Sequence, residues 1–298
     1  MRLLVTGSQG QVARALAERA GGDCQVVCLG RPELDLASGQ DPLPLIRAAD
    51  PDIIVSAAAY TAVDKAESEP DLAFAVNQRG AGAVAKAAAA MDLPLIHLST
   101  DYVFGGQGNR PLREDEPTAP LGVYGASKLA GELAVAEATR DHAILRTAWV
   151  YAPYGVNFLR TMLRLATTRD EVRVVADQFG TPNSALDLAD AILWAARRML
   201  ERPADSALRG LFHLTAEGGP VSWADFAEEI FRLSAAAGGP KAKVTRITTA
   251  DYPTPARRPC WSLLDGGRFR QNFKWRAPDW REGLRKVIGR LAEMGEWA

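Results

Sequence analysis

Tyr124 and Lys128 lie four residues apart where the sequence predicts the start of a helix. That spacing places a phenol and an ammonium on one helix face, within reach of each other. A free tyrosine has a pKa near ~10, and a fixed neighbouring ammonium lowers it by stabilising the phenolate. Such a tyrosine can give a proton to a substrate oxygen while a cofactor delivers hydride to carbon, so we expect Tyr124 to be a proton donor.

Thr100 follows an apolar, strand-like run at 95–99 and precedes Tyr124 by 24 residues. Its hydroxyl would stand at the carboxyl end of a strand, where open α/β sheets bind their ligands. From there it would polarise the same carbonyl that Tyr124 protonates. Tyr-x-x-x-Lys alone is common on surface helices, so the combination with Thr100 and with a glycine turn near the start of the chain favours a reductase site.

That glycine turn, residues 7–12, joins the first predicted strand to the first predicted helix. Gly7 allows a sharp turn, Gly10 lets a bound anion approach the backbone, and Ala13 permits close packing of helix on strand. The free N–H groups at the helix start would face a pyrophosphate. The pattern Gly-x-x-Gly-x-x-Ala differs from G-x-G-x-x-G, but its position favours a dinucleotide site. The residues expected to bind the cofactor here are Gly7, Gln9, Gly10, Gln11 and Val12.

The residues after the second predicted strand bear on which dinucleotide is bound. A cation accommodates the 2′-phosphate of NADP, whereas an acidic residue binds the ribose 2′-hydroxyl of NAD. Arg31 favours NADPH, but Glu33 and Asp35 are close enough to leave NADH possible. The alternative that Arg31 is simply a solvated loop residue also stays open.

Short runs rich in Val, Ile and Leu alternate with longer stretches of helical period. The strand-like runs show no polar alternation, which is typical of parallel strands covered on both faces. This order predicts an α/β fold, a Rossmann-type doubly wound parallel sheet with right-handed crossovers. The expected strands are 2–6, 25–29, 53–57, 95–99, 143–146 and 211–215. The expected helices are 11–20, 81–91, 127–137, 157–166, 186–200 and 223–236.

After Tyr151 the alternation of strand and helix changes, and a proline-rich segment at 248–259 cannot be regular throughout. We expect a smaller C-terminal substrate-binding lobe packed on the sheet. The NAD(P)-binding domain would comprise 1–152 and about 184–216. The discontinuous substrate lobe would comprise about 153–183 and 217–298.

The composition excludes several classes of protein. The chain holds 35 Lys and Arg against 36 Asp and Glu, a formal net charge of −1 at pH 7, so neither nucleic acid nor an anionic membrane is an expected partner. Its three cysteines do not make a disulfide framework and no zinc spacing follows them, which fits a reducing cytoplasm. We see no secretory signal or membrane helix and expect a cytoplasmic protein without a metal site.

Several blocks of sequence carry a resemblance to a known family. Ala-Val-Asp-Lys-Ala-Glu at 62–67 and Ser-Thr-Asp-Tyr-Val-Phe at 99–104 are rather specific. Further matching stretches are 57–61, 123–125 with 128–132, 145–147 with 149–151, 177–182 and 252–259. Over nearly its whole length the chain resembles the extended short-chain dehydrogenase/reductase superfamily and, within it, the dTDP-4-dehydrorhamnose reductase family.

The resemblance implies an activity and a catalytic trio. Members reduce the 4-keto group of dTDP-4-dehydro-β-L-rhamnose with a nicotinamide cofactor and form dTDP-L-rhamnose. Thr100, Tyr124 and Lys128 match the family's catalytic positions. Tyr124 would donate the proton, and Lys128 would lower its pKa and hold the nicotinamide ribose. The implied substrate is therefore a small-molecule nucleotide sugar.

The resemblance also assigns the walls of the site. Small side chains after the third strand, at Ala57, Ala58 and Ala59, would lie along the cofactor. The remaining cofactor contacts would come from Asp35, Leu36, Tyr60, Tyr124 and Lys128. The sugar-side residues would be Thr61, Val63, Thr100, Asp101, Tyr102, Trp149 and Arg258. Arg258 could pair with the diphosphate because a guanidinium fork suits phosphate oxygens.

Alternatives remain within and outside this class. The chain could be a reductase or epimerase of another nucleotide-linked 4-keto-6-deoxysugar, or a non-catalytic, cofactor-binding regulatory subunit. Some family members dimerise through glutamates that share a metal ion, but the matching positions here are Ala15 and Leu186, which cannot ligate a cation. We therefore expect a monomer or a metal-independent homodimer.

Overall fold

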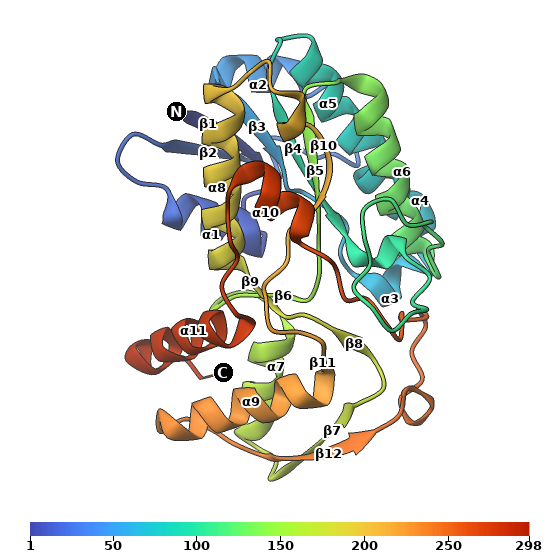
Figure 1. The fold of residues 1–298 in the computed structure, drawn as a ribbon, viewed down its shortest axis with the longest axis vertical. Helices are drawn as coiled ribbons and strands as arrows, with labels where there is room; N and C mark the ends of the chain where they lie inside the picture. The colour runs from blue at the N-terminus through green and yellow to red at the C-terminus, as the bar shows by residue number, and fades with distance from the viewer. Residues whose placement is uncertain (298) are drawn as a thin grey trace.

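A parallel six-stranded sheet is the centre of the computed structural model, which describes residues 1–297 (Figure 1). Its strand order is β10-β5-β4-β3-β1-β2, and every pairing is parallel. The strands are β1 (Arg2–Thr6), β2 (Gln25–Leu29), β3 (Ile53–Ser56), β4 (Leu95–Thr100), β5 (His142–Thr147) and β10 (Gly210–His213). All six predicted strands are confirmed to within two residues at each end, and so is the doubly wound fold.

Helices cover both faces of this sheet. On one face, α1 (Gln11–Arg19) packs against α8 (Ala185–Glu201), and on the other, α5 (Ala81–Ala89) packs against α6 (Val123–Ala138). Successive residues of β1 serve the two faces, since Leu3 and Val5 belong to the core under α1 and α8 while Leu4 belongs to the core under α5. This double burial is why the strands lack polar alternation.

Short elements complete the face that carries α5 and α6. They are α2 (Leu43–Ala49), α3 (Val63–Ala66), α4 (Pro70–Phe74) and the π-helical segment η1 (Ala75–Gly80). Because α4, η1 and α5 follow one another directly, residues 70–89 form one nearly continuous helix with a π-helical section inside it. Such sections often occur at functional sites. The 3₁₀ segments are η2 (Asp101–Val103), η3 (Ser206–Leu208) and η4 (Thr249–Asp251).

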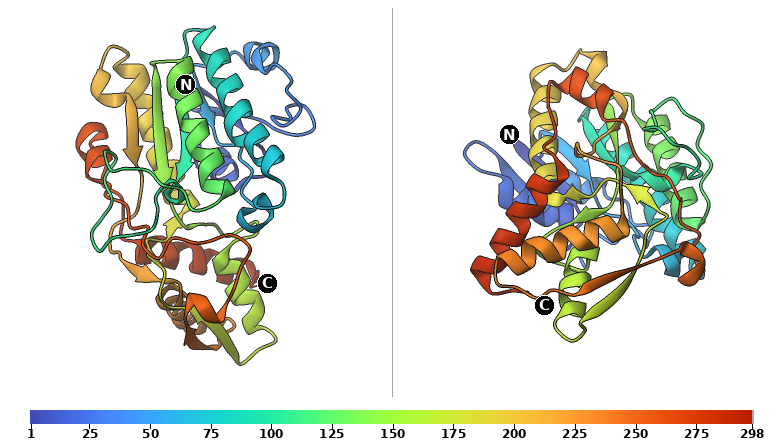
Figure 2. Two further views of the ribbon diagram at one scale, coloured as in Figure 1. Left: turned by 90° about the vertical axis from the view of Figure 1, so that its right-hand side faces the viewer. Right: turned by 60° about the horizontal axis from the view of Figure 1, so that its bottom comes forward.

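A second lobe lies below the sheet in Figure 1 and remains separate from it in the side view of Figure 2. Its core joins α7 (Phe158–Ala166), α9 (Trp223–Ala236) and α11 (Trp280–Met294) to the strand pair β7 (Glu171–Val175) and β12 (Lys243–Ile247). Two further pairings are two residues long: β6 (Val150–Tyr151) with β9 (Asn183–Ser184), and β8 (Phe179–Gly180) with β11 (Val221–Ser222).

Two C-terminal helices are absent from the sequence prediction. In α11, apolar residues recur at helical spacing, and Trp280, Leu284 and Leu291 are buried in the second lobe, so this helix could have been predicted. α10 (Gly267–Phe273) gives no comparable signal because Phe269 and Phe273 are its only buried residues. The rings of Phe269 and Phe273 pack on Phe212 of β10. α10 therefore lies in the core of the sheet, although the sequence analysis assigns this segment to the substrate lobe.

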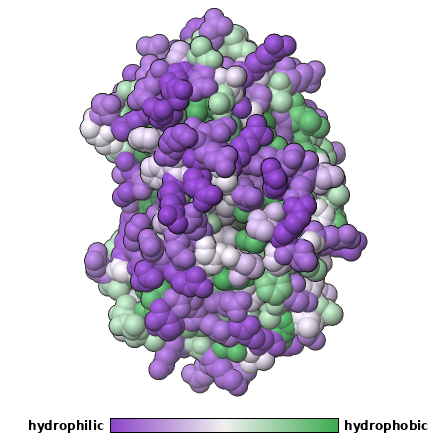
Figure 3. Space-filling view, in the orientation of Figure 1, coloured by the Kyte–Doolittle hydropathy of each residue, from purple (hydrophilic) through white to green (hydrophobic). Residues whose placement is uncertain are grey.

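Polar residues dominate the face of the molecule seen in Figure 3, and the apolar residues there form small groups. No helix within residues 1–297 combines the length and apolarity needed to cross a bilayer.

Two glycines allow α6 to lie unusually close to its neighbours. A Cβ on Gly125 would overlap the carbonyl oxygen of Tyr102 in η2, and a Cβ on Gly131 would overlap the carbonyl oxygen of Asn77 in η1. The helix that carries Tyr124 and Lys128 is therefore fixed against backbone on two sides.

We expect Gly131→Ala to destabilise the protein by about 1–3 kcal/mol, since the added methyl group meets rigid backbone. Gly289→Ala in α11 is the matched control, because a Cβ there meets nothing within 4 Å. That change should stabilise by up to about 1 kcal/mol through helix propensity. Urea unfolding of both variants measures the difference, and a stabilised Gly131→Ala variant would show that the close approach does not matter.

Candidate active site

Thr100, Tyr124 and Lys128 meet where β4 ends and α6 begins. Thr100 is the last residue of β4, and Tyr124 and Lys128 occupy the first two turns of α6. Thr100 and Lys128 are buried, whereas Tyr124 is partly exposed. The Lys128 Nζ donates a hydrogen bond of 2.6 Å to the carbonyl oxygen of Leu98, two residues before Thr100. The structure thus brings together the three residues proposed from the sequence.

The expected effect of Lys128 on Tyr124 is not what the structure shows. Burial raises the pKa of Tyr124 to about 12; Thr100 acts in the opposite direction and the negative charge of Asp101 raises it further. Lys128 instead turns its ammonium to the Leu98 carbonyl. The phenol therefore keeps its proton at neutral pH, which is the form a proton donor requires.

Lys128 is itself perturbed. Burial lowers its pKa to about 8, and the carboxylate of Glu132, one turn further along α6, partly offsets this. Because that value lies close to neutral pH, the charge of Lys128 depends on the groups that surround it.

Asp101 lies deep beside Thr100. Its Oδ1 accepts a hydrogen bond of 3.0 Å from the Thr100 hydroxyl, which in turn accepts one of 3.2 Å from the Tyr102 amide. The Asp101 Oδ2 is buried without a hydrogen-bond partner among the described residues. Burial raises the pKa of Asp101 from 3.8 to about 6. The Thr100 proton is thus directed to Asp101, so Thr100 must rotate its hydroxyl before it can donate to a substrate carbonyl.

The glycine turn has the predicted form. Gly7 has a φ of +89°, and Gly10 precedes α1 with open space where a side chain would stand. Ala58 packs against Gly7, and the Thr6 hydroxyl accepts hydrogen bonds of 3.1 Å from the amides of Ala57 and Ala58. The ends of β1 and β3 therefore form one surface at the start of α1, as a dinucleotide site requires.

The other expected cofactor residues are held in different ways. Gln11 donates to the Val150 carbonyl and accepts from Asn157, so it connects the two lobes. Arg31 is exposed, and Asp35 accepts from the amide of Ala37. Gln9 is exposed, Val12, Ala57 and Ala59 are half-buried, and Leu36 is buried against Gly80.

Asn77 connects the cofactor side to α6. Its amide donates to the Tyr60 carbonyl and accepts from the Tyr60 N–H, at 3.1 and 2.8 Å. It also donates to Ser127, whose hydroxyl donates to the Tyr124 carbonyl at 2.8 Å. Asn77 is buried in η1. A chain of hydrogen bonds therefore runs from the turn after β3 to the backbone of the proposed proton donor.

Among the sugar-side residues, Tyr102 also contacts the trio. Its ring meets the ring of Tyr124 edge-on, with centroids 5.6 Å apart. Trp149 has a φ of +48°, a strained conformation for an aromatic residue, and stacks on Trp223 of α9 at 3.4 Å. Val63 begins α3, and Thr61 just before it is exposed.

Arg258 is already paired. Its Nη1 and Nη2 donate to the two oxygens of Asp64 at 3.0 and 2.7 Å, and Nη1 also donates to Thr254 and to the carbonyl of Ala256. Arg258 thus fastens the proline-rich segment to α3. Its neighbour Arg257 is exposed.

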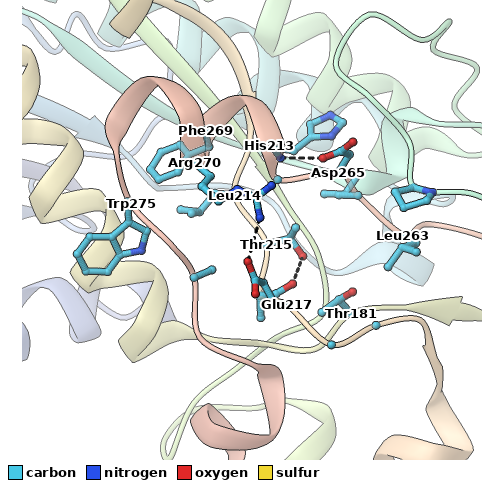
Figure 4. Close-up of a pocket in the computed structure, with 18 residues that line it drawn as sticks. Thr181, His213, Leu214, Thr215, Glu217, Leu263, Asp265, Phe269, Arg270 and Trp275 are labelled. Atoms are coloured by element: carbon cyan, nitrogen blue, oxygen red, sulfur yellow. Dashed lines mark hydrogen bonds and ion pairs between the residues drawn. The ribbon is translucent and has the colours of Figure 1, made fainter.

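A cavity of about 310 Å³ has none of the trio among its lining residues (Figure 4). It opens at the carboxyl end of β10, where His213, Thr215 and Asp265 form part of its wall. Glu217 and Arg270 point toward one another across it and form an ion pair of 3.2 Å. This cavity could not be predicted from the sequence, because its walls come from segments far apart in the chain.

The family's metal positions do not fit a metal here. Ala15 is buried in the core between α1 and α8, and Leu186 packs on the same core. Within residues 1–297 no group of three or more His, Cys, Asp or Glu side chains could hold a metal ion.

The pKa of Asp101 predicts a pH-dependent effect of Asp101→Asn. A carboxyl whose pKa is raised on folding contributes stability at low pH that is lost as the pH rises through its folded value, here about 6. Asparagine keeps an acceptor for Thr100 and does not titrate. The variant should be more stable than the parent at pH 7.5, by on the order of 2 kcal/mol, and this gain should largely vanish at pH 4.

Urea unfolding at the two pH values measures it, with Asp115→Asn at an exposed position as the control. An Asp101→Asn gain that is the same at both pH values would contradict the burial argument.

Comparison with known proteins agrees with this geometry. Residues 1–293 match the family described as RmlD substrate binding domain. A protein of Sinorhizobium fredii named dTDP-4-dehydrorhamnose reductase is 51% identical over 296 residues, 99% of each chain. The crystal structure of a dTDP-4-dehydrorhamnose reductase from Clostridium acetobutylicum has a TM-score of 0.89 at 36% identity and covers 98% of this chain and 99% of that one.

A third relative adds a bound cofactor. The dTDP-4-dehydrorhamnose reductase of Bacillus anthracis, solved in complex with NADP, has a TM-score of 0.88 at 34% identity and covers 97% of this chain and 99% of that one. These matches extend over nearly the full length of the chain, through both lobes. The chain therefore belongs to the RmlD substrate binding domain family, with relatives named dTDP-4-dehydrorhamnose reductase.

Proposed function

We propose that the protein is a dTDP-4-dehydrorhamnose reductase, which converts dTDP-4-dehydro-β-L-rhamnose to dTDP-L-rhamnose with NADPH or NADH. The observation that carries this proposal is the meeting of Thr100, Tyr124 and Lys128 at the junction of β4 and α6. The whole chain is 51% identical, over 296 residues, to a protein named for that activity. A non-catalytic regulatory subunit would have no need of all three residues.

The glycine turn fits a dinucleotide. Gly7 adopts a left-handed conformation, the space above Gly10 is open, and α1 directs its free amides there. When bound, the nicotinamide cofactor supplies the hydride. Exposed Arg31 favours NADPH, which the NADP complex of the relative also supports. Asp35 leaves NADH usable as well.

The chain's own residues supply the proton. Tyr124, whose raised pKa keeps the phenol neutral, donates to the C4 oxygen of the sugar as that oxygen gains negative charge. Thr100 polarises the same carbonyl after its hydroxyl turns away from Asp101. Lys128 keeps a positive charge beside the developing phenolate and holds the nicotinamide ribose.

The second lobe would bind the sugar nucleotide. We propose the two-lobe division expected from the sequence, except that α10 packs on the sheet. Trp149 and Tyr102 would present aromatic faces to the deoxysugar, with Thr61 and Val63 nearby. Arg258 can bind the diphosphate only if its hydrogen bonds to the Asp64 carboxylate are replaced by hydrogen bonds to phosphate oxygens. Three free cysteines fit a cytoplasmic location, and the protein would act as a monomer or a metal-independent homodimer.

Tyr124→Phe should lower kcat by roughly 10²–10⁴-fold, the usual loss when a general acid is removed, while NADPH affinity stays largely intact. The assay mixes protein, NADPH and dTDP-4-dehydrorhamnose and follows the 4-keto sugar and the oxidised cofactor together. Tyr151→Phe, which loses a buried hydroxyl in the second lobe, is the matched control and should retain activity.

The same assay separates the alternatives. A reductase oxidises one cofactor for each sugar reduced, whereas an epimerase leaves the cofactor pool unchanged. Turnover near the parent rate in Tyr124→Phe would remove Tyr124 from its proposed role.

A further inference from the structure

A buried charge pair lies directly behind the trio. Glu132, one turn beyond Lys128 on α6, accepts hydrogen bonds of 2.8 and 2.6 Å from the Nε and Nη2 of Arg146 on β5. It also accepts one of 2.5 Å from the Ser99 hydroxyl. Glu132 is 5% exposed and Arg146 2%, and the Arg146 guanidinium lies 5.0 Å from the centre of the Phe104 ring.

This pair is costly for the fold. The free energy needed to remove two charges from water offsets much of the free energy gained from their attraction. Apolar residues of similar volume would therefore often stabilise the fold as well or better. The pair is also incompletely satisfied, since the Nη1 of Arg146 has no hydrogen-bond partner among the described residues. Stability alone does not account for it at this position.

The contacts show what the pair holds. Lys128 donates to the carbonyl of Leu98, and the next residue, Ser99, donates to Glu132. Two charged residues one turn apart on α6 thus form hydrogen bonds with two consecutive residues of β4, immediately before Thr100. This fixes how far along β4 the helix sits, and with it the position of Tyr124 relative to Thr100.

We propose that Glu132, held by Arg146, is a positioning residue that sets Lys128 and Tyr124 against Thr100 and keeps the Lys128 ammonium charged. This inference rests on the reductase function proposed above and deepens it. Glu132 touches neither substrate nor cofactor in this scheme and acts through Lys128.

The electrostatic surroundings of Lys128 agree. Glu132 raises the pKa of Lys128 against the lowering effect of burial. His97 of β4 has a pKa well below its ordinary value, so it is neutral at pH 7 and does not replace Glu132. η2 contributes Asp101 and Tyr102. Charged groups on the helices packed around α6 are at least partly exposed: Asp64, Lys65, Asp71, Arg79 and Lys86.

Glu132→Gln tests the proposal because it keeps the shape and removes the charge. Without the carboxylate, the lowering effect of burial on Lys128 is no longer offset, and its pKa should fall by roughly one to two units. The alkaline limb of the kcat profile, set by Lys128 near pH 8, should move to lower pH by the same amount. At pH 8 kcat should drop about tenfold and recover as the pH is lowered. Glu132→Asp, which retains the charge, should keep the parent limb.

Asp141→Asn is the matched control. It breaks the 2.7 Å ion pair with Arg209 near the opposite, amino end of β5 and should leave the pH profile unchanged. If Glu132→Gln does not fold, the double variant Glu132→Gln/Arg146→Met removes the unpaired charge of Arg146 as well and should still show an acidic shift of the limb. A folded variant without Glu132 whose alkaline limb matches the parent would overturn the proposal.

A second readout needs no substrate. NMR titration of lysines carrying a ¹³C label, assigned with Lys128→Arg, reports the pKa of Lys128 directly and should show the same fall in Glu132→Gln. If the parent does not reduce the sugar but Lys128 shifts as expected, the reductase proposal fails and the link between Glu132 and Lys128 stands. An unshifted Lys128 refutes the link whatever the activity.

Discussion

The anchoring of α6 on the last residues of β4 is the constraint on which the rest of the structure depends. Lys128 and Glu132 bind consecutive residues of the strand, and the absence of side chains at Gly125 and Gly131 lets the helix approach the neighbouring backbone. A shift of α6 by one turn along β4 would break these buried hydrogen bonds and the close backbone contacts at the two glycines. The Tyr124 phenol therefore stands beside Thr100 before any ligand arrives, which is the preorganisation that proton transfer needs.

The same anchoring connects the two halves of the site. Through Asn77 and Ser127, the backbone of Tyr124 is linked to the turn after β3, which packs on Gly7 of the glycine turn. Asn77 occupies a π-helical section, and a wider turn there sets its amide toward Tyr60 and Ser127 together. A cofactor seated on the glycine turn would thus share a rigid frame with the proton donor, while the second lobe carries Trp223 against Trp149 from the other side.

Much of this frame could be predicted from the sequence, because it depends on local patterns. Unbroken apolar runs gave the six strands, and residue spacing gave the trio and the glycine turn. What could not be predicted depends on residues distant in the chain: the pairing of Arg258 with Asp64, the stacking of Trp149 on Trp223, and the burial that raises rather than lowers the pKa of Tyr124. The buried pair of Arg146 and Glu132 could have been predicted as well. Arg146 stands in an otherwise apolar strand, and Glu132 lies on the helix face of Tyr124 and Lys128.

The central claim is that Tyr124 protonates the sugar oxygen while Lys128 remains at its side. The most direct measurement is a crystal structure of the protein with NADP and dTDP-L-rhamnose, the product of the proposed reaction. We expect the phenolic oxygen of Tyr124 about 3 Å from the sugar O4, with the nicotinamide ribose against Lys128. A sugar O4 beyond hydrogen-bond reach of Tyr124, with another acidic group beside it, would show that Tyr124 is not the proton donor.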